Sequence, residues 1–292
     1  DTYEPGSTFK PFTVAAALEE DLVKPTDTFL CTGVRIVGGW SIHCNNKSGH
    51  GYVTLAEALM KSCNPALMAI GEKEGRDLFR NYQDRFGFGE KTGIDLPGEA
   101  TGILFPIERL NITELVSSSF GQTFNVTMIE LTAAFCSLIN GGYYYQPHVV
   151  KEIINDNGAT VVENSPILVR ETVSSSTCEF LKDALYLTVE KGTAKPAKVE
   201  GYLVGGKTGT AQKQPRSSKK YVVSFIGSVP ADDPQLVIFV AIDEVHDEEK
   251  QASSSFATTL TSEILSEILP FAGIYPEGEI ASKVEIPQVL DD

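Results

Sequence analysis

A run of three strand-like segments closed by a helical segment constrains the fold of this chain most strongly. The strand patterns cover residues 203–212, 221–229 and 236–243, and turn-forming residues separate the last two. An amphipathic helical pattern follows over residues 253–269. A β-meander closed by a helix predicts an antiparallel sheet covered by helices, which is an α+β fold.

The preceding part of the chain has mainly helical patterns. Helices are predicted over residues 7–20 and 65–86, the second broken near Gly75. A hairpin turn at 156–158 is flanked by two short strand patterns. Three further helix starts are predicted from capping boxes, in which Ser or Thr precedes Glu by three positions: Thr54/Glu57, Thr127/Glu130 and Ser176/Glu179.

Composition excludes several classes of protein. The chain of 292 residues has 24 basic and 39 acidic side chains, a net charge of −15. Nucleic-acid binding depends on cations that neutralise phosphates, so no nucleic-acid partner is expected. The longest clean apolar run, residues 236–242, is too short to span a membrane and indicates a buried strand.

Signatures of cofactor and metal sites are absent from the linear sequence. There is no Walker loop, no GxGxxG after a strand, no HExxH and no CxxC. No two of the five cysteines lie near two histidines at zinc spacing, so we expect no metal and no cofactor. Cys31 and Cys44 bracket a hairpin-like stretch, which makes them candidates for a disulfide in an oxidising compartment, with free thiols as the alternative.

A serine and a lysine at the start of the first helix form a candidate nucleophile and base. Ser7 and Lys10 are three positions apart, so they share one helix face. The helix amino end favours a nearby oxyanion, and a desolvated lysine can lose its proton and act as a base. A second SxxK, Ser217/Lys220, lies in a polar loop and is expected to be incidental.

Two further motifs follow in order. Ser62-Cys63-Asn64 comes just after the helix that begins at Thr54, where a loop can direct both polar side chains into a cleft. Lys207-Thr208-Gly209 lies in a predicted strand, whereas a second KTG at 91–93 lies in a glycine-rich loop. SxxK, SxN and KTG, in this order and each in a fitting element, are far less expected by chance than any one of these motifs alone.

These segments resemble the three active-site motifs of penicillin-binding protein transpeptidases. The motif residues are Glu4-Pro5-Gly6-Ser7-Thr8-Phe9-Lys10, Ser62-Cys63-Asn64 and Lys207-Thr208-Gly209-Thr210. The resemblance extends over about residues 1–270 and includes Phe86–Gly89, Leu96–Glu99, Ser119–Gln122 and Asn140–Gly142. It is greatest to the class B, monofunctional enzymes, which are bacterial envelope proteins that cross-link peptidoglycan.

The resemblance implies a β-lactamase/transpeptidase-like α+β fold, with an antiparallel sheet flanked by helices and an all-helical lobe. In that family, sheet strands, another domain and a membrane anchor precede the catalytic helix, whereas Ser7 here follows only six residues. We therefore expect residues 1–275 to be a transpeptidase domain truncated at its amino end, from a protein on the extracytoplasmic face of the plasma membrane. Residues 276–292 are expected to be a linker, or, from the pattern at 284–289, the start of a PASTA-type repeat.

The resemblance also implies a role for each motif residue. Ser7 would attack the D-Ala-D-Ala carbonyl, Lys10 would activate it, and Ser62 would relay a proton to the leaving amine. Two residues would assist: Lys207 would tune the local potential and Asn64 would bind the substrate amide. The remaining expected contacts come from one strand, where Thr208 and Thr210 would hold the terminal carboxylate, Gly209 would line the peptide, and the backbone N–H groups of Ser7 and Thr210 would bind the oxyanion.

The expected partners are stem peptides of peptidoglycan, β-lactams, and membrane proteins of division, elongation or sporulation. Three other functions remain open at this stage. A β-lactamase-like hydrolase would need a base, for which Glu99 and Glu108 are the candidates. A D,D-carboxypeptidase would use water as the acceptor, and a β-lactam sensor would be acylated without turnover.

Overall fold

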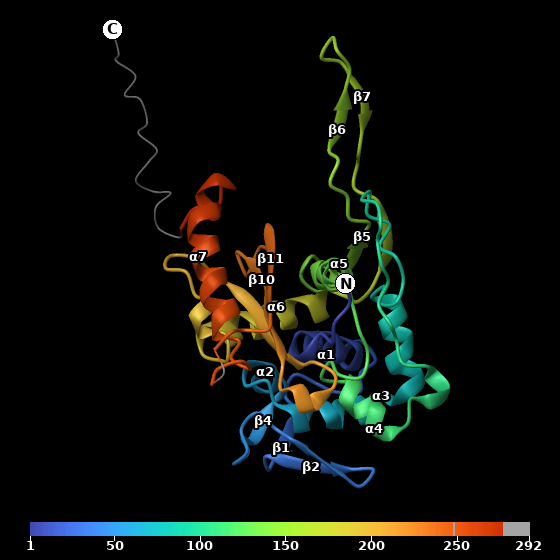
Figure 1. The fold of residues 1–292 in the computed structure, drawn as a ribbon, viewed down its shortest axis with the longest axis vertical. Helices are drawn as coiled ribbons and strands as arrows, with labels where there is room; N and C mark the ends of the chain where they lie inside the picture. The colour runs from blue at the N-terminus through green and yellow to red at the C-terminus, as the bar shows by residue number, and fades with distance from the viewer. Residues whose placement is uncertain (248, 277–292) are drawn as a thin grey trace.

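A three-stranded antiparallel sheet in the order β11-β10-β9 organises the computed structural model, which describes residues 1–247 and 249–276 (Figure 1). Its strands are β9 (Gly205–Gln212), β10 (Tyr221–Val229) and β11 (Leu236–Asp243). The predicted meander is confirmed, and the bounds of β10 and β11 are those expected from the sequence. β9 begins two residues later than predicted.

Alternation along the strands supplies both faces of this sheet with core side chains. Phe225 of β10 belongs to the same buried cluster as Leu265 of α7 (Ser255–Phe271), while its neighbour Ile226 joins the larger core around the helices. Figure 1 shows α7 on one side of the sheet and α1 (Lys10–Glu19) and α5 (Met128–Ile139) on the other. The sheet is thus covered by helices on both faces, as predicted.

The helical lobe is built on the first helix and the long α3 (Asn64–Arg85). A 3-10 turn over Gly6–Phe9 leads directly into α1, and α3 is kinked at Gly75, whose φ of 69° is left-handed, as the sequence predicts. Phe9 packs against Phe12 with ring centroids 5.4 Å apart. Residues from α1, α3 and the following loops form one buried core, which fixes α1 relative to the start of α3.

Two of the three predicted capping boxes are present, and the third is wrong. Thr54 caps α2 (Leu55–Met60) and Thr127 caps α5, each with reciprocal bonds to its Glu. α6 (Ser175–Glu190) is instead capped by Ser174, whose hydroxyl accepts from the Thr177 N–H. Ser174 is held there because its hydroxyl also donates to Glu19 of α1.

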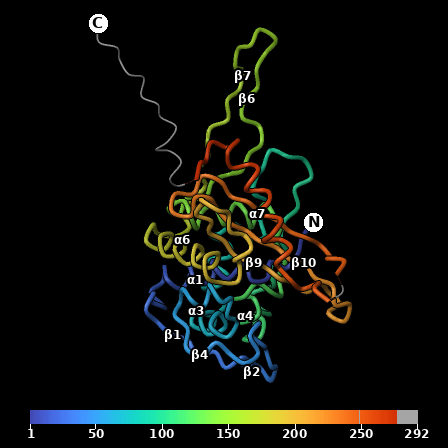
Figure 2. The backbone as a smooth tube through the Cα atoms, turned by 90° about the vertical axis from the view of Figure 1, so that its left-hand side faces the viewer, coloured from blue at the N-terminus to red at the C-terminus, as the bar shows by residue number. Residues whose placement is uncertain are grey.

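The remaining elements are short. α4 spans Ile112–Ser118, and β6 (Glu152–Ile154) and β7 (Thr160–Glu163) form the predicted hairpin, which projects from the body (Figures 1 and 2). The hairpin-like stretch between Cys31 and Cys44 is confirmed as β2 (Val34–Val37) and β3 (Trp40–His43). Pairs absent from the sequence prediction are β1 (Thr28–Cys31) with β4 (Gly51–Thr54) and β5 (Tyr143–Tyr145) with β8 (Leu168–Glu171). Short 3-10 turns lie at Ile107–Arg109, Lys195–Ala197 and Arg216–Ser218.

Across residues 1–247 and 249–276, none of the helices is long and apolar enough to cross a membrane. The segment at 284–289 with the PASTA-like pattern lies outside the described residues.

Candidate active site

The turn that carries Ser7 packs directly against β9. Gly6 has a left-handed φ of 56°, and a Cβ there would lie 2.7 Å from the Thr210 carbonyl oxygen. A Cβ on Gly209 would lie 2.9 Å from Cγ2 of Thr8 and 3.1 Å from the Pro5 carbonyl oxygen. Glycine at both positions therefore permits the backbone of the first motif to touch the third.

Lys10 joins the first motif to the second. It is the first residue of α1, and its side chain is fully buried. Its Nζ donates to the Ser62 carbonyl at 2.7 Å, to Ser62 Oγ at 3.0 Å and to Asn64 Oδ1 at 2.7 Å. The SxxK and SxN motifs, more than fifty positions apart in sequence, thus share one hydrogen-bond network.

Lys207 completes this network from the sheet. The register places it opposite Ile226, so its side chain is on the face of the sheet that meets the helical core. Lys207 is fully buried, and its Nζ donates to Ser62 Oγ at 3.0 Å and to the Thr208 carbonyl at 3.3 Å. One hydroxyl, that of Ser62, therefore lies between two buried lysine amines.

Burial changes the proton affinity of both amines. Loss of hydration lowers the pKa of Lys10 to about 8. Burial, reinforced by the positive charge of Lys10, also lowers the pKa of Lys207 well below its usual range. Because two adjacent buried ammonium groups repel one another, the site favours a state in which one amine is neutral and can accept a proton.

Ser62 is held in an unusual backbone conformation. Its φ of 53° is in the left-handed region, which costs a non-glycine residue about 1–3 kcal/mol. The Ser62 N–H donates to the Leu59 carbonyl at 3.0 Å, and the Cys63 N–H donates to the Ala58 carbonyl at 2.8 Å. The end of α2 thus fixes the turn that directs Ser62 Oγ towards the lysines.

Asn64 is held from two sides. It is the first residue of α3, its Oδ1 accepts from Lys10, and its Nδ2 donates to the His43 carbonyl at 2.9 Å. Thr208 and Thr210 lie with Gly209 on β9, which is an edge strand of the described sheet. Thr208 is buried and Thr210 partly exposed, so this edge offers both backbone and hydroxyl groups for binding a ligand.

The duplicate motifs lie outside the network, as expected. Ser217 is exposed, and Lys220 pairs with Glu244 at 2.6 Å. In the second KTG, the Thr92 hydroxyl and N–H donate to Glu99 at 2.6 and 2.7 Å. Glu99 therefore organises its own loop, and Glu108 is exposed in a 3-10 turn.

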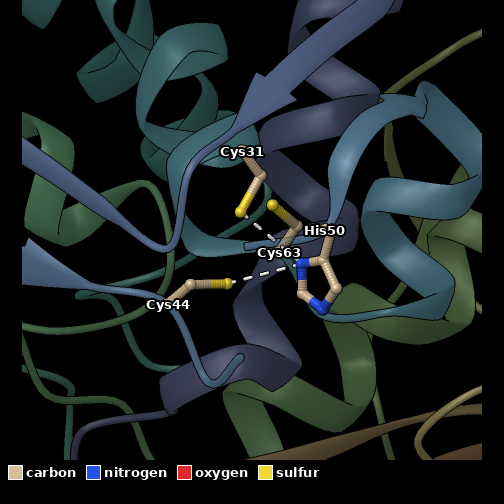
Figure 3. Close-up of side chains that lie close together, drawn as sticks. All are labelled: Cys31, Cys44, His50 and Cys63. Atoms are coloured by element: carbon tan, nitrogen blue, oxygen red, sulfur yellow. Dashed lines mark hydrogen bonds between the residues drawn. The ribbon is translucent and has the colours of Figure 1, made fainter. Parts of the chain in front are cut away.

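One cluster bears on the expectation of no metal, because the fold brings together four potential ligands that linear spacing does not connect. Cys31, Cys44, His50 and Cys63 place one ligand atom each within 4.8 Å of all the others (Figure 3). Both candidate disulfide partners, Cys31 and Cys44, are free thiols in the structure. Linear spacing missed this cluster because its members come from four separate parts of the fold. The one local signal was Cys63, the middle residue of the SxN motif.

Comparison with known proteins agrees with this geometry. The profile of the penicillin binding protein transpeptidase domain matches residues 1–266. The chain belongs to this family. Among curated proteins, the transpeptidase domain is 42% identical to Stage V sporulation protein D of Bacillus subtilis, over 99% of this chain and 47% of the relative. It is 28% identical to peptidoglycan D,D-transpeptidase MrdA of Acinetobacter baumannii, over 82% of this chain and 39% of the relative. The chain thus spans about half or less of these relatives.

Solved structures agree as well. Penicillin-binding protein 3 of Mycobacterium tuberculosis superposes on the transpeptidase domain with a TM-score of 0.84 at 26% identity, covering 94% of this chain and 64% of that one. The same mycobacterial protein has been solved in complex with ampicillin and with aztreonam. These matches confirm the β-lactamase/transpeptidase-like α+β fold expected from the sequence.

Proposed function

We propose that this domain is a peptidoglycan D,D-transpeptidase that forms an acyl-enzyme on Ser7 and is acylated there by β-lactams. The observation that carries the proposal is the position of Ser62 Oγ, 3.0 Å from each of two buried lysine amines, one of which, Lys10, directly follows the turn that carries Ser7. This network can move a proton away from a serine nucleophile and back to a leaving amine. Family membership and the names of the relatives support the same reaction.

In the first step, Ser7 Oγ attacks the carbonyl carbon of the bond between the two terminal D-alanines. The hydroxyl proton passes to the neutral amine of Lys10 as the new C–O bond forms. The C–N bond then breaks. Ser62 donates its hydroxyl proton to the departing amine and accepts a proton from the lysine pair. Free D-Ala leaves, and the stem peptide stays esterified to Ser7.

Substrate contacts come from the strand edge and from the start of α3. The N–H groups of Ser7 and Thr210 bind the oxyanion, where each donor contributes about 3 kcal/mol in related acyl-transfer sites. The hydroxyls of Thr208 and Thr210 hold the terminal carboxylate, and the peptide pairs along Gly209 as an added strand. Asn64 binds an amide of the stem peptide.

In the second step, an amine of a neighbouring stem attacks the ester carbonyl and loses a proton to Lys10. The C–O bond to Ser7 breaks as the new amide forms, and Ser7 Oγ takes back a proton from Lys10. A β-lactam follows only the first step, because the amine released by ring opening stays tethered to the acyl group. Hydrolysis of that ester would need a carboxylate base, and neither Glu99 nor Glu108 is free and enclosed for this role.

We also propose that the domain works on the extracytoplasmic face of the membrane, where its peptidoglycan substrate lies. Membrane proteins of division, elongation or sporulation remain its predicted partners. The 42% identity to a sporulation protein favours sporulation among these three.

Product analysis distinguishes this proposal from its alternatives. The chain is incubated with a donor peptide ending in D-Ala-D-Ala and with an acceptor amine, and products are resolved by mass spectrometry. We expect the amide formed by transfer of the donor peptide to the acceptor amine. The Ser217→Ala variant should form the same amount, because this serine is exposed in the duplicate motif. If the hydrolysed acid were the sole product, the domain would be a carboxypeptidase. Acylation by a β-lactam without any peptide product would indicate a sensor.

The rate of acylation should rise with pH. Lys10 acts as a base only when neutral, and burial lowers its pKa to about 8, so acidification below that value removes the active form. For a single base of this pKa, the penicillin acylation rate increases about fifty-fold between pH 6 and pH 8 and about two-fold more above it. Stopped-flow measurement over this range checks the profile. A rate independent of pH between 6 and 9 would remove Lys10 from the role of base.

A further inference from the structure

Strand pairing brings four potential metal ligands together beneath the active site. β1 and β4 pair with Cys31 opposite Gly51, which places His50 next to Cys31. Just after β3, the Cys44 N–H donates to the Gly33 carbonyl at 2.8 Å, which draws Cys44 to the same point. Cys63 is the residue that precedes α3. Figure 3 shows the four side chains converging from these separate segments.

Two distances within the cluster match those of a tetrahedral zinc site. The Sγ atoms of Cys31 and Cys44 lie 3.6 and 3.5 Å from His50 Nδ1. With Zn–S and Zn–N bonds of about 2.3 and 2.0 Å, tetrahedral geometry requires S···N separations of about 3.5 Å. All four ligand atoms lie within 4.8 Å of one another, so a small contraction around an ion would complete the coordination.

The chemistry of the donors selects zinc. Three sulfurs and one imidazole nitrogen form a soft donor set that suits zinc and not magnesium or calcium, which prefer oxygen. The three cysteines are buried and His50 is half-buried, so four protein ligands can close the site against substrate. A closed Cys₃His set is typical of structural zinc.

Two glycines hold the ligand-bearing loops against each other. Gly33 and Gly49 have left-handed φ values of 88° and 85°. A Cβ on Gly49 would lie 2.8 Å from the Thr32 carbonyl carbon and 3.0 Å from the Gly33 nitrogen. The loop after Cys31 and the loop between Cys44 and His50 therefore touch through their backbones, which orders the ligands before any ion binds.

We infer that Cys31, Cys44, His50 and Cys63 bind one structural zinc ion. On binding, the three thiols become thiolates and release three protons to solvent, while His50 stays neutral, so the loaded site has a net charge of −1. A disulfide between any two cysteines would use two of these ligands and prevent the site from forming.

Through Cys63, the ion also positions the SxN motif, a consequence that rests on the proposed function. Cys63 separates Ser62 from Asn64, and two hydrogen bonds tie the same segment to the Cys44 loop. Asn64 Nδ2 donates to the His43 carbonyl at 2.9 Å, and Asn45 Nδ2 donates to the Lys61 carbonyl at 3.1 Å. The zinc-bound loop thus holds Ser62 Oγ at the two lysines, and Cys63 is a positioning residue.

Metal content tests the site directly. The full chain, purified without chelator, should contain about one zinc per molecule by plasma mass spectrometry. Cys31→Ser and His50→Ala should lose it, whereas Cys136→Ser, a free cysteine outside the cluster, should keep it. Cobalt substituted for zinc should give the thiolate charge-transfer and d–d absorption of a tetrahedral site. A wild-type chain that purifies without zinc and takes up neither zinc nor cobalt, or one with a disulfide among these cysteines, would overturn the inference.

Removal and return of the ion test the positioning role even if the variants fail to fold. Chelator-treated wild-type chain that keeps its far-UV circular dichroism should be acylated by penicillin at least about tenfold more slowly at saturation, with little change in penicillin affinity. Adding zinc should restore the rate; an unchanged rate in the folded, metal-free chain would overturn this role. A wild-type chain that binds zinc but is not acylated by penicillin would contradict the proposed function alone. A wild-type chain that is acylated but takes up no zinc at all would contradict the zinc site alone.

Discussion

Replacing Ser7 by alanine should reduce D-Ala release from a D-Ala-D-Ala peptide by more than about a thousandfold, to background. The substitution removes the atom that forms the ester, while the lysine network around Ser62 keeps its hydrogen bonds. Ser7 is only partly buried, and it lies inside the 3-10 turn Gly6–Phe9, which follows Pro5. Loss of its hydroxyl should therefore leave the fold intact. Release of D-Ala is measured by a coupled assay, with circular dichroism to confirm folding.

The duplicate motif supplies a matched control for this experiment. Ser217 also begins an SxxK sequence, but it is exposed in a surface turn. Ser217→Ala should therefore leave D-Ala release unchanged. If the Ser7 and Ser217 variants both retained full activity, the nucleophile would have to be sought elsewhere in the chain.

Lys10→Met should slow acylation by about 10²- to 10⁴-fold, the usual contribution of a positioned general base. Methionine has a similar length and suits a buried site, but it cannot accept a proton. The variant also leaves the Ser62 carbonyl and Asn64 Oδ1 without the donor they use now. Part of the loss is thus expected from a looser SxN loop, so acylation is measured at saturating penicillin and over a range of pH.

Two observations separate a lost base from a damaged fold. The rise in rate between pH 6 and pH 8 should disappear in Lys10→Met, because the group whose pKa is about 8 is gone. The control Lys220→Met removes the lysine of the duplicate motif, which pairs with Glu244 on the surface, and should retain both rate and profile. A Lys10→Met enzyme with the wild-type rate would mean that another group activates Ser7.

The main sheet was predictable because its signals are local. β10 and β11 are nine and eight residues long and rich in apolar and β-branched residues, and the turn-rich residues 230–235 separate them. The missed pairs β1–β4 and β5–β8 have strands of three or four residues, too short for a periodic pattern. The start of α6 was misplaced because Ser174 is selected as the cap by a contact with Glu19, far away in sequence.

The same distinction between local signals and contacts of distant residues applies to the active site. Three short motifs suffice to identify Ser7, Lys10, Ser62, Asn64 and Lys207 as candidates, since each motif is contiguous in the sequence. The convergence of Lys10 and Lys207 on one hydroxyl depends on how α1 and β9 pack, which spacing does not predict. The Cys₃His cluster depends wholly on pairing between distant strands, so the same cysteines suggested only a disulfide in the linear sequence.

The most direct test of the Ser7 acyl-enzyme is the intact mass of the chain after incubation with a labelled penicillin, beside the Ser7→Ala variant. The account predicts one stable adduct, equal to the whole penicillin, on the wild-type chain, located by peptide mapping to Ser7. It predicts no adduct on the variant. A folded wild-type chain that gains no mass, or a variant that gains the same mass, would contradict it.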